Sequence, residues 1–246
     1  MFESSALLAV VIAAATITGA LGVGMKLLNK LPFALQQSVN LDGITKTFQY
    51  LTRPQFLIPD IELDNLNQLD IRVLRSKGIK CIVFDKDNTL THTYKDEIHP
   101  SIRAVVDTIK LEFTADCVAI LSNSVGSCDD KDFRGATSTE KSLGMSVIRH
   151  MRKKPGCVRE VAEHFKARTG KEVVLSEIAV IGDRLLTDVL FANDCGMLSV
   201  LVAPLSVVHD HPVAVVIRSL ERRLLLPIFK LMRHLLGRAT GEASGK

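Results

Sequence analysis

The sequence predicts an α/β fold in which a parallel sheet is covered by helices on both faces. From residue 78 onward, continuous apolar runs alternate with helix-like segments. Strands that are apolar on both sides are typical of parallel sheets buried under helices. Polar side chains directly follow several of these runs, and ligands of such sheets bind at the carboxyl ends of the strands. An apolar content of 47% supports a substantial core.

The expected elements follow one another along residues 79–202. Apolar runs predict the strands, and glycine and proline mark the segment ends. We expect strands at 79–84, 117–121, 145–148, 178–181 and 198–202. We expect helices at 101–113 after His99-Pro100, at 137–144, at 156–169 before Gly170, and at 186–193.

The chain divides into four parts by composition. Residues 1–25 form an apolar segment, and residues 26–77 form a connecting region punctuated by prolines, with a short helix at 41–51. Residues 78–205 form the α/β domain, and residues 206–246 form basic amphipathic helices with a tail. The 246 residues suffice for one α/β domain with appended elements.

The apolar segment at the N-terminus predicts a membrane anchor. Residues 6–24 carry no charge and are long enough to cross a bilayer as a helix. No basic region precedes them and the first arginine is Arg53, which argues against a secretory signal and a mitochondrial transit peptide. Lys26 and Lys30 would leave the rest of the chain on the cytosolic or matrix side. A buried or oligomer-forming helix is the alternative.

The cysteine pattern argues against two kinds of structural site and indicates a compartment, and the charge is unevenly distributed. The five cysteines show no C-x-x-C spacing and are odd in number, which argues against a disulfide framework and a zinc site. A reducing compartment, either cytosol or an organelle matrix, fits this pattern. The net charge of +4 is mild, but basic residues gather at 149–159 and at 218–238.

Two carboxylates, Asp85 and Asp87, directly follow the first apolar strand. At a strand end they can divide the work of phosphoryl transfer. Asp85 would attack phosphorus to form an aspartyl-phosphate, while Asp87 would protonate the leaving alkoxide and later deprotonate water. Thr89 is expected to hold the loop that positions Asp87. For the pair taken alone, a turn or a calcium loop is the alternative.

Three further residues are candidates for contact with a phosphoryl group. Ser122 and Asn123 follow the second strand and offer a hydroxyl and an amide, although a simple turn is the alternative. Lys154 precedes Pro155, which suits the first position of a helix. There, Lys154 can bind the transferring group and offset the charge of the nucleophile. A solvated basic patch is the alternative for this lysine and its basic neighbours.

A second pair of carboxylates, Asp183 and Asp188, lies after a later apolar run that ends at Gly182. Together with Asp85 they can complete an oxygen-rich magnesium site. Mg²⁺ would neutralise charge that repels the attacking aspartate, and would keep the clustered carboxylates ionised. Helix capping by Asp183 is the alternative.

In the order D-x-D-x-T, Ser, Lys and G-D-x(4)-D, these motifs resemble the haloacid dehalogenase superfamily of phosphatases over about residues 78–203. The resemblance implies a Rossmann-like fold in which Asp85 is the nucleophile and Asp87 the general acid and base. It implies that Ser122 and Lys154 bind phosphate. It further implies Mg²⁺ bound by Asp85, Asp183 and the main-chain carbonyl of Asp87, with Asp188 supporting that site.

The spacing of these motifs leaves little room for a cap domain. One helix and one strand fill the interval between Ser122 and Lys154, and the loop after Asp87 is short. An uncapped site suits substrates that are embedded in a protein or a membrane.

Two amphipathic helices are predicted after the α/β domain. On the first of them, an apolar face is expected opposite a charged face. The apolar face comprises Val213, Val216, Ile217, Leu220 and Leu224, and the charged face comprises Arg218, Glu221 and Arg222. After Pro227 the pattern repeats with further basic residues, which indicates helices attracted to anionic lipid. Packing on the domain or in an oligomer interface is the alternative.

The exact residues around the motifs are similar to those of the mitochondrial phosphatidylglycerophosphate phosphatases of haloacid dehalogenase type. The similar segments are 84–90, 121–124, 149–150, 153–156 and 182–185, with Arg53-Pro54 and Pro59-Asp60-Ile61 before them. The resemblance implies hydrolysis of phosphatidylglycerophosphate to phosphatidylglycerol, the step before cardiolipin synthesis, at the matrix face of the mitochondrial inner membrane. The expected partners are a phospholipid substrate and an anionic membrane surface, without nucleic acid; a homo-oligomer is left open.

Three other functions stay open. The same fold could dephosphorylate proteins or small phosphomonoesters, or the chain could be a phosphoacceptor regulatory domain or a catalytically silent membrane scaffold. Receiver domains place an acidic pair on an early strand and the lysine last. Here a carboxylate pair follows Lys154, which disfavours the regulatory domain.

Overall fold

A computed structural model describes residues 53–154, 156–206 and 212–243. The chain forms two compact units, one made of Pro59–Asp210 and the other of Met1–Ile58 with His211–Lys246. The predicted anchor at 1–25 and the predicted helix at 41–51 lie outside the described residues.

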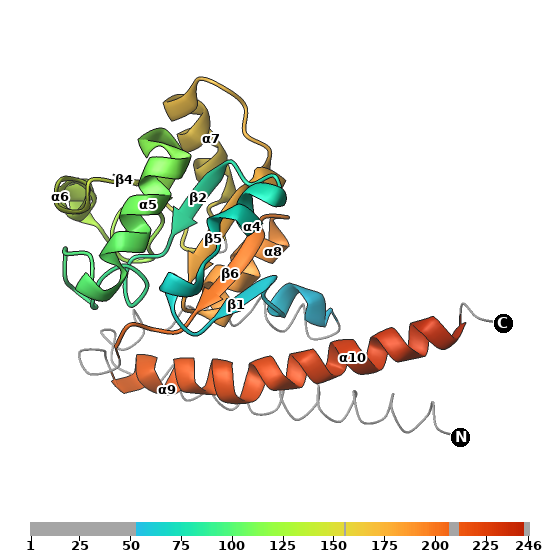
Figure 1. Ribbon diagram of the computed structural model, residues 1–246. Helices are drawn as coiled ribbons and strands as arrows, with labels where there is room; N and C mark the ends of the chain where they lie inside the picture. The colour runs from blue at the N-terminus through green and yellow to red at the C-terminus, as the bar shows by residue number, and fades with distance from the viewer. Residues whose placement is uncertain (1–52, 155, 207–211, 244–246) are drawn as a thin grey trace. The chain divides into compact units, whose positions relative to one another are not determined.

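The first unit is built on one parallel sheet (Figure 1). Its order is β1-β6-β5-β2-β3-β4, and every strand pair in it is parallel. The strands are β1 (Ile61–Leu63), β2 (Cys81–Phe84), β3 (Val118–Ile120), β4 (Ser146–Val147), β5 (Ile178–Gly182) and β6 (Leu198–Val202). Because β2 lies between β5 and β3, its carboxyl end is at the centre of the sheet edge.

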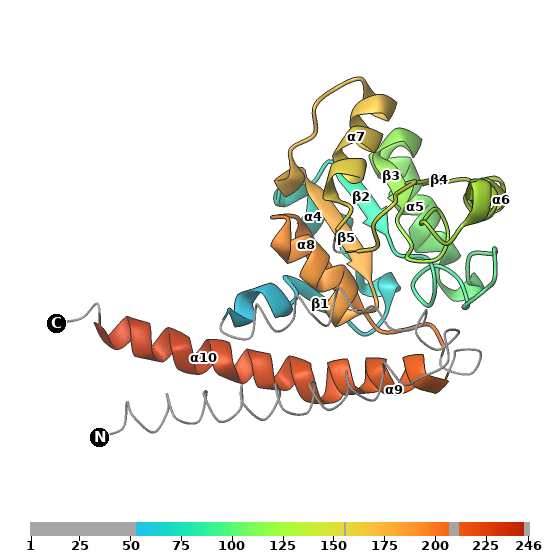
Figure 2. The same ribbon diagram turned by 180° about the vertical axis from the view of Figure 1, so that it is seen from behind.

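Helices cover both faces of this sheet, as the opposite views in Figures 1 and 2 show. Successive side chains of a strand point to opposite faces, so Ile82 and Phe84 of β2 join one core while Cys81 and Val83 join the other. The first core includes α4 (Ile71–Ser76), α5 (Arg103–Phe113) and α6 (Arg134–Leu143). The second includes α7 (Val158–Thr169) and α8 (Leu190–Asp194). The predicted Rossmann-like α/β fold is confirmed.

Local sequence explains where several helices begin and end. Asp70 caps α4 by accepting the N–H of Arg72 at 2.9 Å. The helix α7 ends at Gly170, whose φ of +69° is a left-handed conformation that costs glycine little. Short 3₁₀ turns connect the elements at Pro54–Leu57, Leu66–Gln68, Pro100–Ile102, Ala115–Cys117, Lys131–Phe133 and Leu175–Glu177.

The structure corrects the sequence-based boundaries in three places. The predicted connecting region at 26–77 contains β1, which pairs with β6 at the edge of the sheet, and also α4. The helix α7 begins at Val158, so Lys154 does not stand directly before a helix start. The predicted helix at 186–193 is a π-helical turn, Leu185–Val189, followed by α8.

The second unit contains a helical run from Pro212 to Ala243, within its described part. It consists of α9 (Pro212–Leu220), a π-helical segment Glu221–Leu225, and α10 (Leu226–Ala243). Arg218 and Glu221 of the predicted charged face are buried, whereas Val216, Leu220 and Leu224 of the predicted apolar face are exposed. No helix within the described residues is long and apolar enough to cross a membrane.

Candidate active site

The candidate residues gather at the carboxyl edge of the sheet because neighbouring strands β5, β2 and β3 end there. Asp85 directly follows β2, and its N–H donates to the carbonyl oxygen of Ile181 in β5 at 2.8 Å. Ser122 follows β3, where the N–H of Leu121 donates to the carbonyl oxygen of Phe84 at 2.8 Å. Asp183 directly follows β5.

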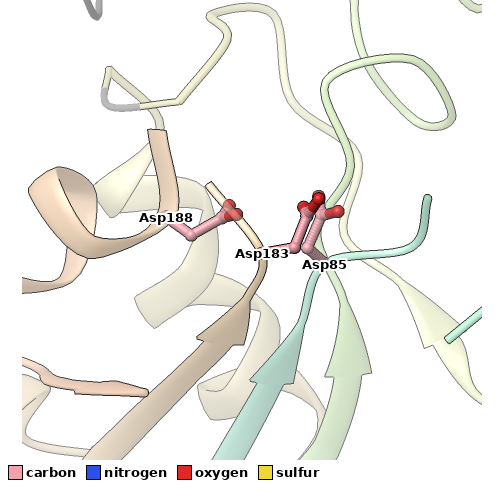
Figure 3. Close-up of side chains that lie close together, drawn as sticks. All are labelled: Asp85, Asp183 and Asp188. Carbon is pink, nitrogen blue, oxygen red and sulfur yellow. The ribbon is translucent and has the colours of Figure 1, made fainter. Parts of the chain in front are cut away.

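Three carboxylates form a cluster at this edge, which Figure 3 shows above the ends of two adjacent strands. One oxygen from each of Asp85, Asp183 and Asp188 lies within 4.8 Å of the others. Asp188 comes from the π-helical turn, a rare irregularity that is frequent at functional sites. The carboxylate of Asp188, for which the resemblance implies a supporting role, lies in the same cluster.

Lys154 provides the positive charge inside this cluster. Its Nζ donates to Asp85 Oδ1 at 2.7 Å, to Asp188 Oδ1 at 2.5 Å and to the carbonyl oxygen of Leu121 at 2.9 Å. Burial by itself would lower the pKa of Lys154, but the carboxylates of Asp188 and Asp85 outweigh it and raise the pKa above its usual value. The ammonium group is therefore held in its charged form.

Asp85 is the most exposed of these paired groups. Its side chain is 12% exposed, whereas those of Lys154 and Asp188 are each 1% exposed. Burial raises the pKa of Asp85 to about 6; the Lys154 charge opposes this shift and the Asp188 charge adds to it. At neutral pH the carboxylate is still mostly ionised. An ionised carboxylate that an incoming group can reach has the properties required of a nucleophile.

Gly182 allows Asp188 to approach the strand end. A Cβ atom at position 182 would overlap the carboxylate of Asp188, and Asp188 Oδ2 also accepts the N–H of Arg184 at 3.1 Å. The glycine that precedes Asp183 is therefore required by close packing rather than by its own backbone conformation.

Gly182→Ala is expected to destabilise the protein by about 1–3 kcal/mol, because the added methyl group must displace a tightly held carboxylate. Urea denaturation followed by circular dichroism would measure this change. Gly156→Ala is the comparison and should cost less, since its Cβ would meet Arg152 Cβ and Lys153 O at 3.3 Å, a tight contact but not an overlap. Equal stability of Gly182→Ala and the wild-type protein would contradict the packing argument.

The donor set of this cluster fits a hard divalent cation. Three carboxylates face one ammonium group, so two negative charges remain when all four groups are ionised. Burying such an excess without compensation is costly, and carboxylate oxygens are the ligands that Mg²⁺ takes in proteins. Asp85, Asp183 and Asp188 are the residues that could bind it.

The predicted phosphate-binding residues also meet at this edge. Ser122 is buried, and its Oγ lies 2.9 Å from Ser124 Oγ. Asn123 Oδ1 accepts the main-chain N–H of Lys154 at 2.8 Å, so this residue holds the lysine segment in place. The roles of Ser122 and Asn123 in substrate binding stay predictions.

The expected role of Thr89 does not match its contacts. Thr89 is buried, and its hydroxyl oxygen has no hydrogen-bond partner within the described part of the chain. The loop is held instead through main-chain bonds, with Leu90 N–H and Thr91 N–H donating to the carbonyl oxygen of Lys86 at 2.9 and 3.1 Å. Asn88 adds a side-chain bond to Thr93 at 2.9 Å.

Sequence reasoning missed three residues that organise the site. Lys86 was treated as a spacer within D-x-D, yet it is buried and its Nζ lies 3.3 Å from Asp87 Oδ1. Ser124 Oγ donates to Asp87 Oδ2 at 3.1 Å. His150 places its two ring nitrogens 2.9 Å from the carbonyl oxygen of Ser122 and 2.7 Å from that of Arg152. Each of the three lies in a segment (84–90, 121–124 or 149–150) whose similarity to the family was the available signal.

A family model described as mitochondrial PGP phosphatase matches residues 41–205, more than half of the chain. The chain belongs to this family. The predicted family and its enzyme class, a phosphatidylglycerophosphate (PGP) phosphatase, are thereby confirmed.

Individual relatives of the mitochondrial PGP phosphatase family agree with this match. The chain is 37% identical over 195 residues to phosphatidylglycerophosphate phosphatase 1, chloroplastic/mitochondrial, of Arabidopsis thaliana, covering 78% of this chain and 54% of that protein. It is 35% identical over 164 residues to phosphatidylglycerophosphatase GEP4, mitochondrial, of Saccharomyces cerevisiae, covering 67% and 87%. It is 28% identical to the probable phosphatase YqeG of Bacillus subtilis, covering 70% and 91%.

The chain spans about half the length of the Arabidopsis relative and most of the yeast relative. No solved structure gave a significant match to this chain.

Proposed function

We propose that this protein is a magnesium-dependent phosphatase that dephosphorylates phosphatidylglycerophosphate to phosphatidylglycerol through an aspartyl-phosphate on Asp85. The main support for this proposal is the position of Asp85. It is the accessible member of a buried cluster, and its carboxylate is bonded to Lys154 at 2.7 Å. The names of the Arabidopsis and yeast relatives support the choice of substrate.

In the first step, a carboxylate oxygen of Asp85 forms a bond to phosphorus and the bond from phosphorus to the lipid oxygen breaks. Asp87 gives its proton to that oxygen, so phosphatidylglycerol leaves as the alcohol. Lys154 and Ser122 stabilise the negative charge of the transferring phosphoryl group. Bound Mg²⁺ would supply electrostatic stabilisation of the same charge, held by Asp85, Asp183, Asp188 and the main-chain carbonyl of Asp87.

In the second step, water attacks the phosphorus of the aspartyl-phosphate while Asp87 takes its proton. The bond from Asp85 to phosphorus breaks, inorganic phosphate leaves, and the carboxylate is regenerated. Asp87 thus finishes protonated, ready for the next substrate. The cycle needs no reactant other than the phosphomonoester and water.

The surroundings of the site support a substrate presented by a large structure. Between β3 and α7 the chain forms a 3₁₀ turn, α6 and the two-residue strand β4. The side chain of Asp87 is 20% exposed, and the loop after it carries Tyr94 with 78% of its surface exposed. We propose that this open edge receives a headgroup that stays attached to a membrane.

Purified protein is expected to release phosphate from phosphatidylglycerophosphate in Mg²⁺ and to lose this activity in EDTA. Metal binding can also be measured through protein stability, because Mg²⁺ at 100 times its Kd would raise the free energy of unfolding by about 2.7 kcal/mol. Asp183→Asn is expected to remove most of this stabilisation. Activity that persists in EDTA would contradict the metal dependence, and cleavage of phosphopeptides or small phosphomonoesters alone would favour the alternative substrates.

An exposed apolar face supports a membrane partner for the second unit. Leu220, Leu224 and Leu231 expose 43%, 48% and 57% of their surfaces, and Val216 exposes 66%. The spacing of four residues places Val216, Leu220 and Leu224 on one side of the helical run. Arg223, Lys230 and Arg233 are exposed on the same run. Apolar side chains flanked by basic ones are typical of helices that lie on anionic lipid.

The double variant Leu220→Glu/Leu224→Glu is expected to bind vesicles of phosphatidylglycerol and cardiolipin at least about tenfold more weakly than the wild-type chain. It loses two apolar side chains from the interface and adds repulsion from the anionic surface. Vesicle flotation would measure the change. Leu111→Glu is the matched control, because Leu111 is 81% exposed on α5 of the other unit. Unchanged binding by the double variant would contradict the assignment of this face.

We further propose the matrix side of the mitochondrial inner membrane as the site of action. The mitochondrial description of the family supports the organelle. The matrix side is supported by the odd number and the spacing of the cysteines, which favour a reducing compartment.

A further inference from the structure

The carboxylate of Asp87 is held by donors on both of its oxygens. Oδ1 lies 3.3 Å from Lys86 Nζ and 3.3 Å from the main-chain nitrogen of Tyr94. Oδ2 accepts a hydrogen bond from Ser124 Oγ at 3.1 Å. Lys86 and Tyr94 belong to the same loop as Asp87, whereas Ser124 comes from the loop after β3.

The Oδ1 side of this arrangement is anchored firmly. Lys86 is 2% exposed, and its Nζ also donates to the carbonyl oxygen of Lys95 at 2.7 Å and lies 3.3 Å from Asp96 Oδ1. Asp96 in turn accepts a hydrogen bond from Thr139 of α6 at 2.9 Å. An ammonium group and a main-chain N–H can only donate. Within the described residues, both hydrogen-bond partners of Oδ1 are therefore donors, and neither could receive a proton from it.

The Oδ2 side is different because a hydroxyl can both donate and accept. Ser124 Oγ can donate to the carboxylate form of Asp87 and accept from the carboxylic acid form. Ser122 Oγ lies 2.9 Å from Ser124 Oγ, and Ser124 N–H donates to Ser122 Oγ at 3.2 Å. When Asp87 is a carboxylate, the single Ser124 proton goes to it and the hydroxyl of Ser122 supplies the bond between the two serines. When Asp87 is protonated, Ser124 can donate to Ser122, which leaves the Ser122 proton for the phosphoryl group. The carboxyl oxygen that is linked through Ser124 to the candidate phosphate ligand is thus Oδ2.

We propose that Ser124 is a positioning residue that holds Asp87 so that Oδ2 carries the proton transferred to the leaving group. This inference rests on the proposed function, in which Asp87 is the general acid and base. Ser124 does not contact phosphorus itself. It acts by keeping the acid beside the phosphoryl site in both protonation states, which neither Lys86 nor the Tyr94 main chain can do.

The test depends on leaving groups of different basicity. The leaving group of phosphatidylglycerophosphate is the alkoxide of phosphatidylglycerol, which needs a proton, whereas the p-nitrophenolate that leaves p-nitrophenyl phosphate is stable without one. Ser124→Ala is expected to lower kcat for the lipid about tenfold with KM within about twofold of wild type, since general acid catalysis is impaired but binding is not. The pre-steady-state burst of p-nitrophenolate should stay within about twofold of wild type.

Two further variants separate positioning from loop structure. Ser124→Thr keeps a hydroxyl and is expected to recover most of the lost kcat. Ser127→Ala removes a hydroxyl from the same loop, where Ser127 Oγ donates to the carbonyl oxygen of Ser124 at 2.9 Å without contacting Asp87. It should show no dependence on the leaving group.

Several results would overturn this assignment while leaving the proposed function intact. These are wild-type kcat for Ser124→Ala on the lipid, an equal fall in the aryl burst, or the same leaving-group dependence in Ser127→Ala. Failure of the proposed function has a different signature, because the wild-type chain itself would not release phosphate from the lipid. A wild-type chain inert on both esters would overturn the proposed function and this inference together.

Discussion

Asp85→Asn is expected to lower phosphate release from phosphatidylglycerophosphate by about 10⁴-fold or more, because the neutral amide cannot form the aspartyl-phosphate. The substitution keeps the size of the side chain, and Lys154 retains its bond to Asp188 at 2.5 Å. The fold should therefore survive. Burial and the neighbouring Asp188 disfavour the charge of Asp85, so its removal relieves repulsion within the cluster.

Steady-state phosphate release and trapping of the acid-stable or hydroxylamine-sensitive phosphoenzyme would measure this effect. Asp116→Asn is the matched control, because Asp116 makes an exposed ion pair with Arg168 at 2.7 Å and lies before β3, at the opposite edge of the sheet. It should retain wild-type activity. Turnover by Asp85→Asn above a tenth of the wild-type rate, or a phosphoenzyme in that variant, would contradict the assignment of the nucleophile.

The strands that could be predicted from the sequence are the ones that are apolar on both faces. β6 matches its predicted range, 198–202, because four of its five residues are apolar and four of the five are buried. β1 was missed since it has three residues, carries Glu62 in the middle and lies at the edge of the sheet. Such a strand depends on its pairing with β6 rather than on any local pattern.

The sequence could predict those site residues that directly follow the ends of strands. Asp85 and Asp183 stand directly after β2 and β5, which are neighbours, so a parallel sheet brings them together. The helix start expected after Lys154 was wrong, yet the lysine still reaches Asp85 across 69 positions of sequence. Tertiary contacts fix the position of the lysine. Asn123 accepts the Lys154 N–H, and the ring of His150 lies between two carbonyl oxygens.

The hydrogen bonds that position the Asp87 carboxylate could not be predicted, because they depend on side-chain contacts between separate loops. Ser124 lies 37 positions from Asp87 and four residues after the end of β3, where a serine is common in turns. Lys86 points back into the protein, although lysine is mostly exposed in folded chains. Only the packed structure shows that both side chains face one carboxylate.

Lys154→Met is expected to destabilise the protein by about 3–5 kcal/mol in EDTA, because it removes the cation from a buried cluster of carboxylates. The side chain is 1% exposed and bonds to Asp85 and Asp188, so water cannot replace the lost charge. Methionine fills a similar volume, which separates the loss of charge from the loss of packing. Urea denaturation in EDTA would measure the difference.

The same variant can test whether lysine and metal compensate the same charges. Saturating Mg²⁺ is expected to reduce the destabilisation of Lys154→Met, since the cation neutralises the carboxylates that the lysine faced. Lys166→Met is the matched control: Lys166 pairs with Glu172 on the surface, where both side chains are more than half exposed, and such pairs contribute at most about 1 kcal/mol. A Lys154→Met protein as stable as this control in EDTA would show that the lysine does not offset the carboxylates. In that case the folded protein would not contain the excess negative charge on which the proposed magnesium site is based.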